Sequence, residues 1–573
     1  MRSLRTKLFI KNMKKYCLLV FLALFLLLTA CAPIRQEPSQ DQSAPPAEQP
    51  AAPSASTDYS VPTFQLDKLP DLPAYAGLPK EIYTRYSSEA YVDTLRLASD
   101  YGQLYPYIGK VVNADFFALE LRYGLVDNQG RIVVDPVYSG ASYITTGPEP
   151  GADYLSLSYP IDKIDAAAKE TGQQTGYYDM RTHFQFAKAD GSWVSPLYYG
   201  NNAILSEDRV IVSLQSDNPD YRYSNEGDKY QLYDLESNLI AEGIGSLSGF
   251  SEGLSLLTIP KTENGSYYTD CSYIDQDGHT VIAGPFSSAT DFKDGKALVT
   301  LENGALFAVI DKQGNYLVEP KQLGDSFYVY DSDYLTFWNN GLEGMIDRMG
   351  NTVLPAIYNY IYYDVLLGGY AAAQKPDGTY EAVDLQTGRA VPVDGDYTDV
   401  FTSGDGWLIA QKSDMNSQIY SPPDVSLIRG DKQYQFPGSE YGDLYLSYIA
   451  NDIFAVNVYS DPVDGKSSVS FFDAATGETV KVWPGWNYSD SEQTPQGPVH
   501  YIYNYDSSYS QKTMALSDDF ESIFPKEALA GIAAFNQISY LKDGLFSVRT
   551  DRYGGLIRAD GSWLIRVVAQ EQD

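Results

Sequence analysis

Side chains able to do chemistry are sparse in this sequence of 573 residues. It contains three histidines, His183, His279 and His500, which lie far apart, and none has a second histidine or a cysteine at the spacing of metal ligands. The sequence has neither the Walker A pattern nor the Gly-x-Gly-x-x-Gly pattern of phosphate-binding loops. We therefore predict no catalytic residue, no metal site and no cofactor, and expect that the protein is not an enzyme.

Carboxylates are abundant, with 75 aspartates and glutamates, so pairs suited to glycoside hydrolysis arise by chance. Asp275 and Asp277 stand in one tight turn and offer two ligands to calcium, but the distal glutamate of the usual calcium loop is absent. The preference of aspartate for tight turns is enough to explain both Asp275 and Asp277. Cys271 begins an apolar run, which predicts a buried free thiol.

Aromatic side chains are the strongest indication of a binding site. Two clusters lie within one repeat unit and consist of Trp483, Trp486, Tyr488, Tyr501, Tyr503 and Tyr505. Flat rings beside Asn and Asp are able to stack on sugars or to clamp peptides. Rings in a repeat protein also fill the space between sheets, and the sequence leaves this alternative open. We predict that residues 483–509 form the ligand-binding region.

The elements that position these residues are marked by a recurring turn. Asp, two variable residues and Gly stand between short apolar runs at residues 127–130, 275–278, 311–314 and 347–350. Aspartate suits the first position of a type I turn, and glycine suits the fourth. The flanking runs are rich in Val, Ile, Leu and Tyr and have the length of strands, so each unit is predicted to be a hairpin.

The spacing of these turns indicates a repeat architecture. Gly278, Gly314 and Gly350 are 36 residues apart, and longer gaps elsewhere fit two units with one degenerate turn between them. We count about eleven units, each of three or four strands. This pattern predicts an all-β fold of the β-propeller type, with an open β-solenoid of stacked hairpins as the alternative.

The repeats resemble those of the WG-repeat (KWG) proteins, whose unit runs Trp-Gly-aromatic-Ile-Asp-x-x-Gly and then apolar-Pro-x-x-Tyr. Residues 122–130 (RYGLVDNQG), followed by residues 135–138 (DPVY), fit this frame, as do residues 343–358. Tyr123-Gly124 and Glu343-Gly344 stand where Trp-Gly would, so the repeats are degenerate. The resemblance implies a bacterial, often surface-located, all-β protein, and it implies no common activity.

The first 30 residues are typical of a secretory signal. A basic stretch begins at residues 13–15, residues 18–28 are almost wholly apolar, and Leu28-Thr29-Ala30 precede Cys31. This end resembles the lipobox of bacterial lipoproteins, which implies cleavage before Cys31 and a lipid on its sulfur.

The rest of the chain divides into three predicted parts. Residues 31–60 combine the lipidated cysteine with a disordered tether rich in Pro, Ala, Gln and Ser. Residues 61–109 form an N-terminal segment, in which residues 81–98 favour a short helix. Residues 110–573 form the repeat body, which has a second candidate helix at residues 164–172.

The formal net charge of −34 repels phosphate backbones and anionic headgroups, which argues against a nucleic acid partner. We therefore expect a lipoprotein that is held on the extracytoplasmic face of the cell membrane by its lipid anchor only. Its repeat body is expected to bind an unknown protein or glycan ligand at the cell envelope. The alternatives are a propeller-type glycan hydrolase and a structural component of envelope assembly.

Overall fold

The computed structural model describes residues 63–65 and much of the range 95–568, all within one compact unit that spans residues 59–573. The gaps in the second range are residues 96, 99, 115–117, 145–151, 160–181, 216–226, 264–265, 329–332, 365–368, 414–420, 461–466, 506–510, 525–534 and 550–552. The predicted signal, Cys31, the tether, the helix at 164–172 and almost all of the helix at 81–98 lie outside the described residues.

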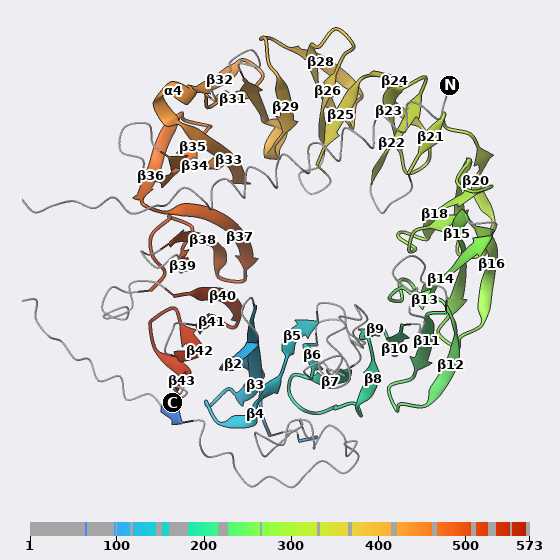
Figure 1. The fold of residues 1–573 in the computed structure, drawn as a ribbon, viewed down its shortest axis with the longest axis vertical. Coiled ribbons are helices and arrows are strands. Elements are labelled where there is room, and N and C mark those ends of the chain that lie inside the picture. The colour runs from blue at the N-terminus through green and yellow to red at the C-terminus, as the bar shows by residue number, and fades with distance from the viewer. Residues whose placement is uncertain are drawn as a thin grey trace, which may run out of the picture. The chain divides into compact units, whose positions relative to one another are not determined.

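The described strands form eleven sheets, in which strands that follow one another in the chain pair antiparallel (Figure 1). We number these sheets blade 1 to blade 11 in chain order. Blade 1 consists of β2 (Leu104–Ala114), β3 (Ala118–Asp127) and β4 (Ile132–Tyr138), and blade 2 of β5 (Gly140–Ile144), β6 (Tyr154–Ser158), β7 (Thr182–Lys188) and β8 (Tyr198–Gly200). Blade 3 consists of β9 (Asn202–Ser206), β10 (Arg209–Leu214), β11 (Lys229–Tyr233) and β12 (Leu239–Ile244), and blade 4 of β13 (Ser246–Leu247), β14 (Leu254–Glu263), β15 (Ser266–Asp275) and β16 (Thr280–Phe286).

Blades 5 to 8 have four strands each. Blade 5 consists of β17 (Ser288–Ala289), β18 (Lys296–Leu301), β19 (Leu306–Asp311) and β20 (Tyr316–Lys321), and blade 6 of β21 (Ser326–Phe327), β22 (Tyr334–Asn339), β23 (Leu342–Asp347) and β24 (Thr352–Tyr358). Blade 7 consists of β25 (Tyr360–Tyr363), β26 (Tyr370–Gln374), β27 (Tyr380–Asp384) and β28 (Arg389–Val393), and blade 8 of β29 (Asp399–Thr402), β30 (Leu408–Lys412), β31 (Asp424–Arg429) and β32 (Lys432–Phe436).

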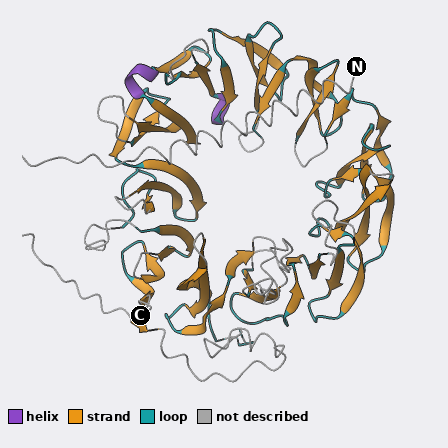
Figure 2. Ribbon diagram, viewed as in Figure 1, coloured by secondary structure: helices purple, strands orange, loops and turns teal. Residues whose placement is uncertain are grey.

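Blades 9 to 11 complete the series. Blade 9 consists of β33 (Asp443–Ala450), β34 (Ile453–Ser460), β35 (Ser468–Asp473) and β36 (Glu478–Pro484), and blade 10 of β37 (Asn487–Thr494), β38 (Gly497–Tyr505) and β39 (Gln511–Leu516). Blade 11 contains β40 (Gln537–Lys542), β41 (Leu545–Arg549), β42 (Tyr553–Arg558) and β43 (Trp563–Val568). The helical elements of the described residues are the single turns η4 (Gly404–Gly406) and α4 (Gly438–Tyr441), so the fold is all-β, as predicted (Figure 2).

The Asp-x-x-Gly turns close hairpins as the sequence predicted. In blade 4, Asp275 Oδ1 accepts hydrogen bonds from the backbone N–H groups of Asp277, at 3.0 Å, and His279, at 2.8 Å. The Gly278 N–H donates to the Asp275 carbonyl oxygen at 3.0 Å, and Gly278 has a φ of 78°, which favours glycine. Asp311 and Asp347 cap their turns in the same way.

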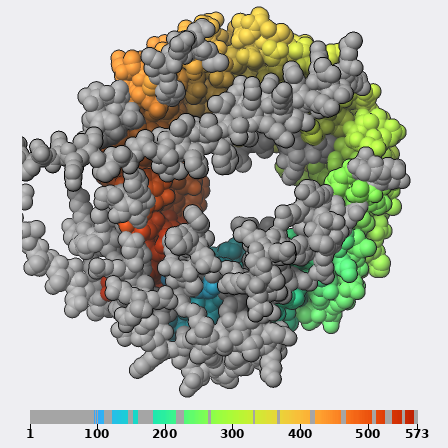
Figure 3. Space-filling view, in the orientation of Figure 1, coloured from blue at the N-terminus to red at the C-terminus, as the bar shows by residue number. Residues whose placement is uncertain are grey.

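Each blade packs its faces against the two neighbouring blades. Eleven clusters of buried apolar side chains join successive blades, and the last of them joins blade 11 back to blade 1. That closing cluster contains Tyr107 and Val126 of blade 1 and Leu556 and Ile565 of blade 11. Burying one such side chain contributes about 1.5–3 kcal/mol to folding. The repeats therefore form a closed eleven-bladed ring around a central opening, which excludes the open solenoid (Figure 3).

The N-terminal segment also contributes to the ring. Strand β1 (Thr63–Gln65) pairs parallel with β43 and gives blade 11 a fifth strand. Strand β2 begins at Leu104, so the repeat body begins six residues ahead of residue 110. Within the described part of the chain, no helix has the length and apolar character needed to cross a membrane.

Candidate functional site

The structure divides the six predicted aromatic residues between the core and the surface. Tyr488 and Tyr501 are buried, and Trp483 and Trp486 are half-buried against the core between blades 9 and 10. A buried ring has no open face for a ligand, so Tyr488 and Tyr501 act as core residues here.

The other two predicted residues lie at the far end of β38. Tyr503 is half-buried, Tyr505 is 59% exposed, and their ring centroids are 5.9 Å apart. The structure therefore does not bring the six residues into one surface.

A cleft of about 510 Å³ opens between blades 10 and 11. Its apolar lining consists of Pro498 and Val499 of blade 10, Ile523 after β39, and Phe546 of blade 11. Thr494, Gln496, Asp518, Asp519 and Tyr540 supply polar groups to the same cleft. Residues 494–499 fall inside the region predicted for binding, but the side chains that line the cleft are different from those predicted. A volume of this size is typical of small-ligand sites.

The acidic wall of the cleft is a turn that follows β39. The Phe520 N–H donates to the Ser517 carbonyl oxygen at 2.9 Å, and Asp519 accepts hydrogen bonds from the Ser517 hydroxyl and from the Glu521 N–H. The Ser517 hydroxyl lowers the pKa of Asp519, so this carboxylate is ionised at neutral pH. Asp518 is exposed and accepts no hydrogen bond from the described residues.

Blade 9 holds this turn in place from behind. The Phe520 ring stacks on Phe471, with centroids 3.9 Å apart and planes inclined by 12°. The Trp483 indole N–H donates to the Phe520 carbonyl oxygen at 3.0 Å. Lys481 pairs with Glu521 at the end of the turn. Trp483 therefore acts in positioning the acidic wall, which the sequence did not predict.

The opposite wall is fixed by a partly buried polar network. The Tyr501 hydroxyl donates to Glu492, and both Glu492 Oε1 and the Tyr501 hydroxyl accept from the Tyr540 backbone N–H, at 2.9 and 2.7 Å. Burial, with a smaller effect from the hydrogen bond to Glu492, raises the pKa of Tyr501 far above its ordinary value. The Tyr540 hydroxyl donates to Gln496 Oε1 at 3.0 Å and joins the two blades across the cleft.

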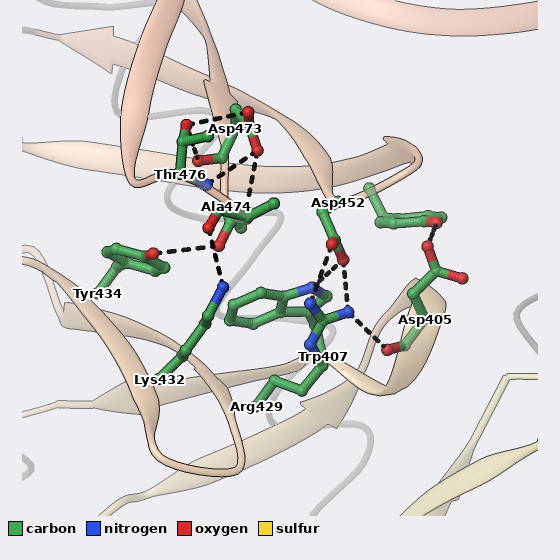
Figure 4. A network of polar contacts seen from close by, with 11 residues as sticks. Asp405, Trp407, Arg429, Lys432, Tyr434, Asp452, Asp473, Ala474 and Thr476 are labelled. Carbon is green, nitrogen blue, oxygen red and sulfur yellow. Dashed lines mark hydrogen bonds and ion pairs between the residues drawn. The ribbon is translucent and has the colours of Figure 1, made fainter.

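A second inter-blade network lies between blades 8 and 9 and is structural (Figure 4). Trp407 is fully buried, and its indole N–H donates to Asp452 Oδ1 at 2.8 Å. Arg429 pairs with the same carboxylate through both Nη atoms, and its guanidinium lies 4.4 Å from the Trp407 ring centroid. The hydrogen bond from Arg429 is the largest cause of the lowered pKa of Asp452.

The left part of Figure 4 shows a similar set of contacts at the Asp473 turn. The Lys432 ammonium group donates to the Ala475 carbonyl oxygen at 2.8 Å, and the Tyr434 hydroxyl donates to the Ala474 carbonyl oxygen at 3.1 Å. Each bond ties blade 8 to the Asp473 turn of blade 9. These polar groups hold blades 8 and 9 together.

Titratable side chains also come together in the turn of Asp275. Asp275, Asp277 and His279 lie close enough to share an ion, with ligand atoms within 4.8 Å of one another, but Asp275 already caps a turn and Arg209 lies 3.7 Å from Asp277. Cys271 is buried with 3% exposure, as predicted, and burial raises the pKa of its thiol.

One sequence pattern that is associated with catalysis forms a turn between two strands in this structure. Residues 249–253 (GFSEG) have the Gly-x-Ser-x-Gly spacing of a nucleophile elbow. They join β13 to β14, which are two strands rather than the strand and helix of such an elbow. The Ser251 hydroxyl donates to the Phe292 carbonyl oxygen at 2.6 Å, so it links blade 4 to blade 5.

Three segments of the chain match the family model described as the WG containing repeat, at residues 123–147, 272–304 and 344–380. Each match begins in the second-last strand of one blade and ends in the next blade, for example from β3 to just beyond β5. The sequence repeat is therefore out of phase with the structural blade, so each repeat unit spans a junction between two sheets.

No curated protein matches this sequence. Among solved structures, a eukaryotic initiation factor is similar with 10% identity over 74% of this chain and 95% of its own, at a TM-score of 0.32. Apo AztD from Citrobacter koseri shows 10% identity over 67% of this chain and 95% of its own, at a TM-score of 0.25. Kluyveromyces lactis Hsv2 shows 10% identity over 48% of this chain and 94% of its own, also at 0.25. With TM-scores below 0.5, these similarities have no bearing on function.

Proposed function

We propose that this chain is a bacterial lipoprotein on the extracytoplasmic face of the cell membrane, and that its ring is a binding scaffold at the cell envelope. The anchor would be a lipid on Cys31, followed by the Pro- and Ala-rich tether. The WG repeats in the ring and the signal pattern before Cys31 support this proposal.

The single observation that carries the binding role is the cleft between blades 10 and 11. It combines a large volume, an apolar interior and fixed polar walls, which is the usual make-up of a ligand site. Its walls include turns between strands, and turn residues accept changes without disturbing the sheets they connect. The proposed ligand is a protein or a glycan.

Binding is tested with the full chain, solubilised in detergent, on an array of cell-wall glycans, peptidoglycan fragments and peptides. Ala559→Trp adds a bulky ring to an exposed turn that lines the cleft, and Gln313→Trp makes the same change on an exposed turn of blade 5. We expect array signals that survive Gln313→Trp and are lost in Ala559→Trp. A chain without any array signal, or one whose signals survive both changes, would contradict the scaffold proposal.

The anchor is tested separately by feeding expressing bacteria an alkyne analogue of palmitate and detecting the label on the protein. We expect label on the wild type and none on Cys31→Ala. The same labelled protein is expected in the membrane fraction and to be cleaved by protease added to intact spheroplasts. Label retained in Cys31→Ala would place the lipid elsewhere.

A further inference from the structure

We infer that the cleft between blades 10 and 11 takes a cationic side chain, the lysine or arginine of a peptide segment with apolar neighbours. This inference rests on the proposed scaffold function and names the partner class for its site.

The charges at the cleft are complementary to a cation. Asp518 and Asp519 line it, and none of the described lining residues is basic. Two lysines of the flanking blades are already paired, because Lys481 contacts Glu521 and Lys542 contacts Asp153 of blade 2. Within the part of the chain that the structure describes, the exposed Asp518 carboxylate forms no ion pair, and the net charge of the molecule is −34.

The shape of the cleft favours a long side chain with a charged end. Pro498 and Ile523 are half-buried and present apolar surface to the cleft, and the nearly fully buried Val499 and Phe546 lie beside them. Lysine and arginine lay their methylene stems on such apolar surface while the charged group stays near solvent. The same arrangement would place the ammonium or guanidinium group at the acidic turn, where a charge-assisted hydrogen bond is stronger than a neutral one.

A peptide fits these observations better than a glycan does. Sugar recognition commonly uses an open aromatic face, and Phe546, with 2% exposure, offers none. Tyr540 is half-buried, and its hydroxyl is already bonded to Gln496. Gly497 and Gly544, which have no side chain, also line the cleft, so the backbone of an extended peptide can approach it closely.

The test measures fluorescence anisotropy of three labelled pentapeptides, Gly-Leu-X-Leu-Gly with both ends blocked, against the full chain in detergent. X is lysine, norleucine or glutamate, so the three peptides share the apolar part and differ in charge. We expect the lysine peptide to bind at least tenfold more tightly than the norleucine peptide, and the glutamate peptide not to bind. The preference should shrink as salt is raised, because Asp518 is exposed.

Two matched variants locate the charge that is recognised. Asp518→Asn removes one carboxylate that holds no part of the turn, and Asp431→Asn makes the same change in the exposed β31–β32 turn of blade 8. Asp518→Asn should weaken the lysine peptide about tenfold and leave the norleucine peptide unchanged, while Asp431→Asn should change neither. Equal thermal melting of all three proteins confirms that each is folded.

The inference is overturned if the lysine and glutamate peptides bind equally, or if none of the three binds. It is also overturned if Asp431→Asn weakens binding as much as Asp518→Asn, since the general negative field would then be the cause. In each of these cases the scaffold proposal is still judged by the array and by Ala559→Trp, so the two failures are distinguishable.

Discussion

The Trp483 indole N–H donates a 3.0 Å hydrogen bond to the backbone carbonyl oxygen of Phe520, from β36 of blade 9 to the turn after β39 of blade 10. The Phe520 ring is stacked on Phe471 at the same junction. A packing contact between two blades thus determines where the carboxylates of Asp518 and Asp519 stand in the neighbouring cleft. The junction between blades 9 and 10 and the cleft between blades 10 and 11 are coupled through this turn.

Replacing Trp483 with Phe keeps an aromatic ring in the junction and removes the indole N–H. We expect the free energy of unfolding to fall by about 1 kcal/mol, because the Phe520 carbonyl oxygen loses a half-buried partner. The lysine peptide should also bind more weakly, since the acidic turn is less well held. Urea titration and anisotropy measure the two effects, and Trp338→Phe on β22 serves as the control. Unchanged peptide affinity would separate Trp483 from the cleft.

Asp452→Asn tests the network between blades 8 and 9. Asparagine tolerates the positive φ of 65° at this position and can still accept from the Trp407 indole, but the charge opposite Arg429 is lost. We expect a loss of about 1 kcal/mol at pH 7, because the pair is partly exposed. Urea unfolding measures it, and Asp431→Asn, in the same β31–β32 turn as Arg429, should stay within about 0.5 kcal/mol of the wild type.

The same variant has a pH signature. Because the pKa of Asp452 is lowered in the folded protein, its contribution is present above the unfolded value near 3.9 and is lost as the pH falls through the folded value. The difference in stability between the wild type and Asp452→Asn should therefore shrink below pH 4. A difference that is constant from pH 7 to pH 3 would contradict the ion pair.

His500 should make the fold less stable in mild acid. It is 1% exposed, neither ring nitrogen has a hydrogen-bond partner among the described residues, and the Phe520 ring lies 4.9 Å away. Burial lowers the pKa of His500, with a smaller opposing effect of Asp518. The unfolded chain therefore takes up a proton near pH 6.5, before the folded protein does, so the free energy of unfolding falls as the pH drops below about 6.5.

His500→Phe keeps a ring of similar shape in the junction and removes the titration. Melting temperatures at pH 7.5 and pH 5.5 should differ less in this variant than in the wild type. Met514→Leu serves as the control, because it changes an apolar side chain at the same junction and removes no titratable group, so it should keep the wild-type pH dependence. A wild-type dependence that persists in His500→Phe would assign it to other groups.

Ring closure is tested at two glycines with nearly the same backbone conformation. Gly130 has a φ of 81° and Gly304 a φ of 84°, so alanine strains both by about 1 kcal/mol. A Cβ on Gly130 would lie 2.5 Å from the Leu564 carbonyl oxygen of blade 11, whereas nothing lies within 4 Å of a Cβ on Gly304. Gly130→Ala should therefore cost about 1–3 kcal/mol more than Gly304→Ala in urea unfolding. Equal costs would indicate that blades 1 and 11 separate easily.

Local chemistry in the sequence was sufficient to predict the turns and the repeated β-sheet architecture. An aspartate whose carboxylate caps backbone N–H groups, followed by a glycine at positive φ, specifies a tight turn wherever it occurs, and its 36-residue spacing indicated repeated sheets. The burial of Cys271 was also evident from its apolar run. These features depend on residues that are close together in the chain.

The tertiary structure alone decided ring closure and the make-up of the cleft. The closing contact between Tyr105 and Asp543 joins residues 438 positions apart, and no local pattern reports such a contact. Trp483 and Tyr501 have the composition of a binding surface, yet they pack at blade junctions, because an aromatic ring suits a core as well as a ligand site. Asp518 and Phe546 meet at one cleft only because the turn after β39 and strand β41 come together when blade 11 packs against blade 10.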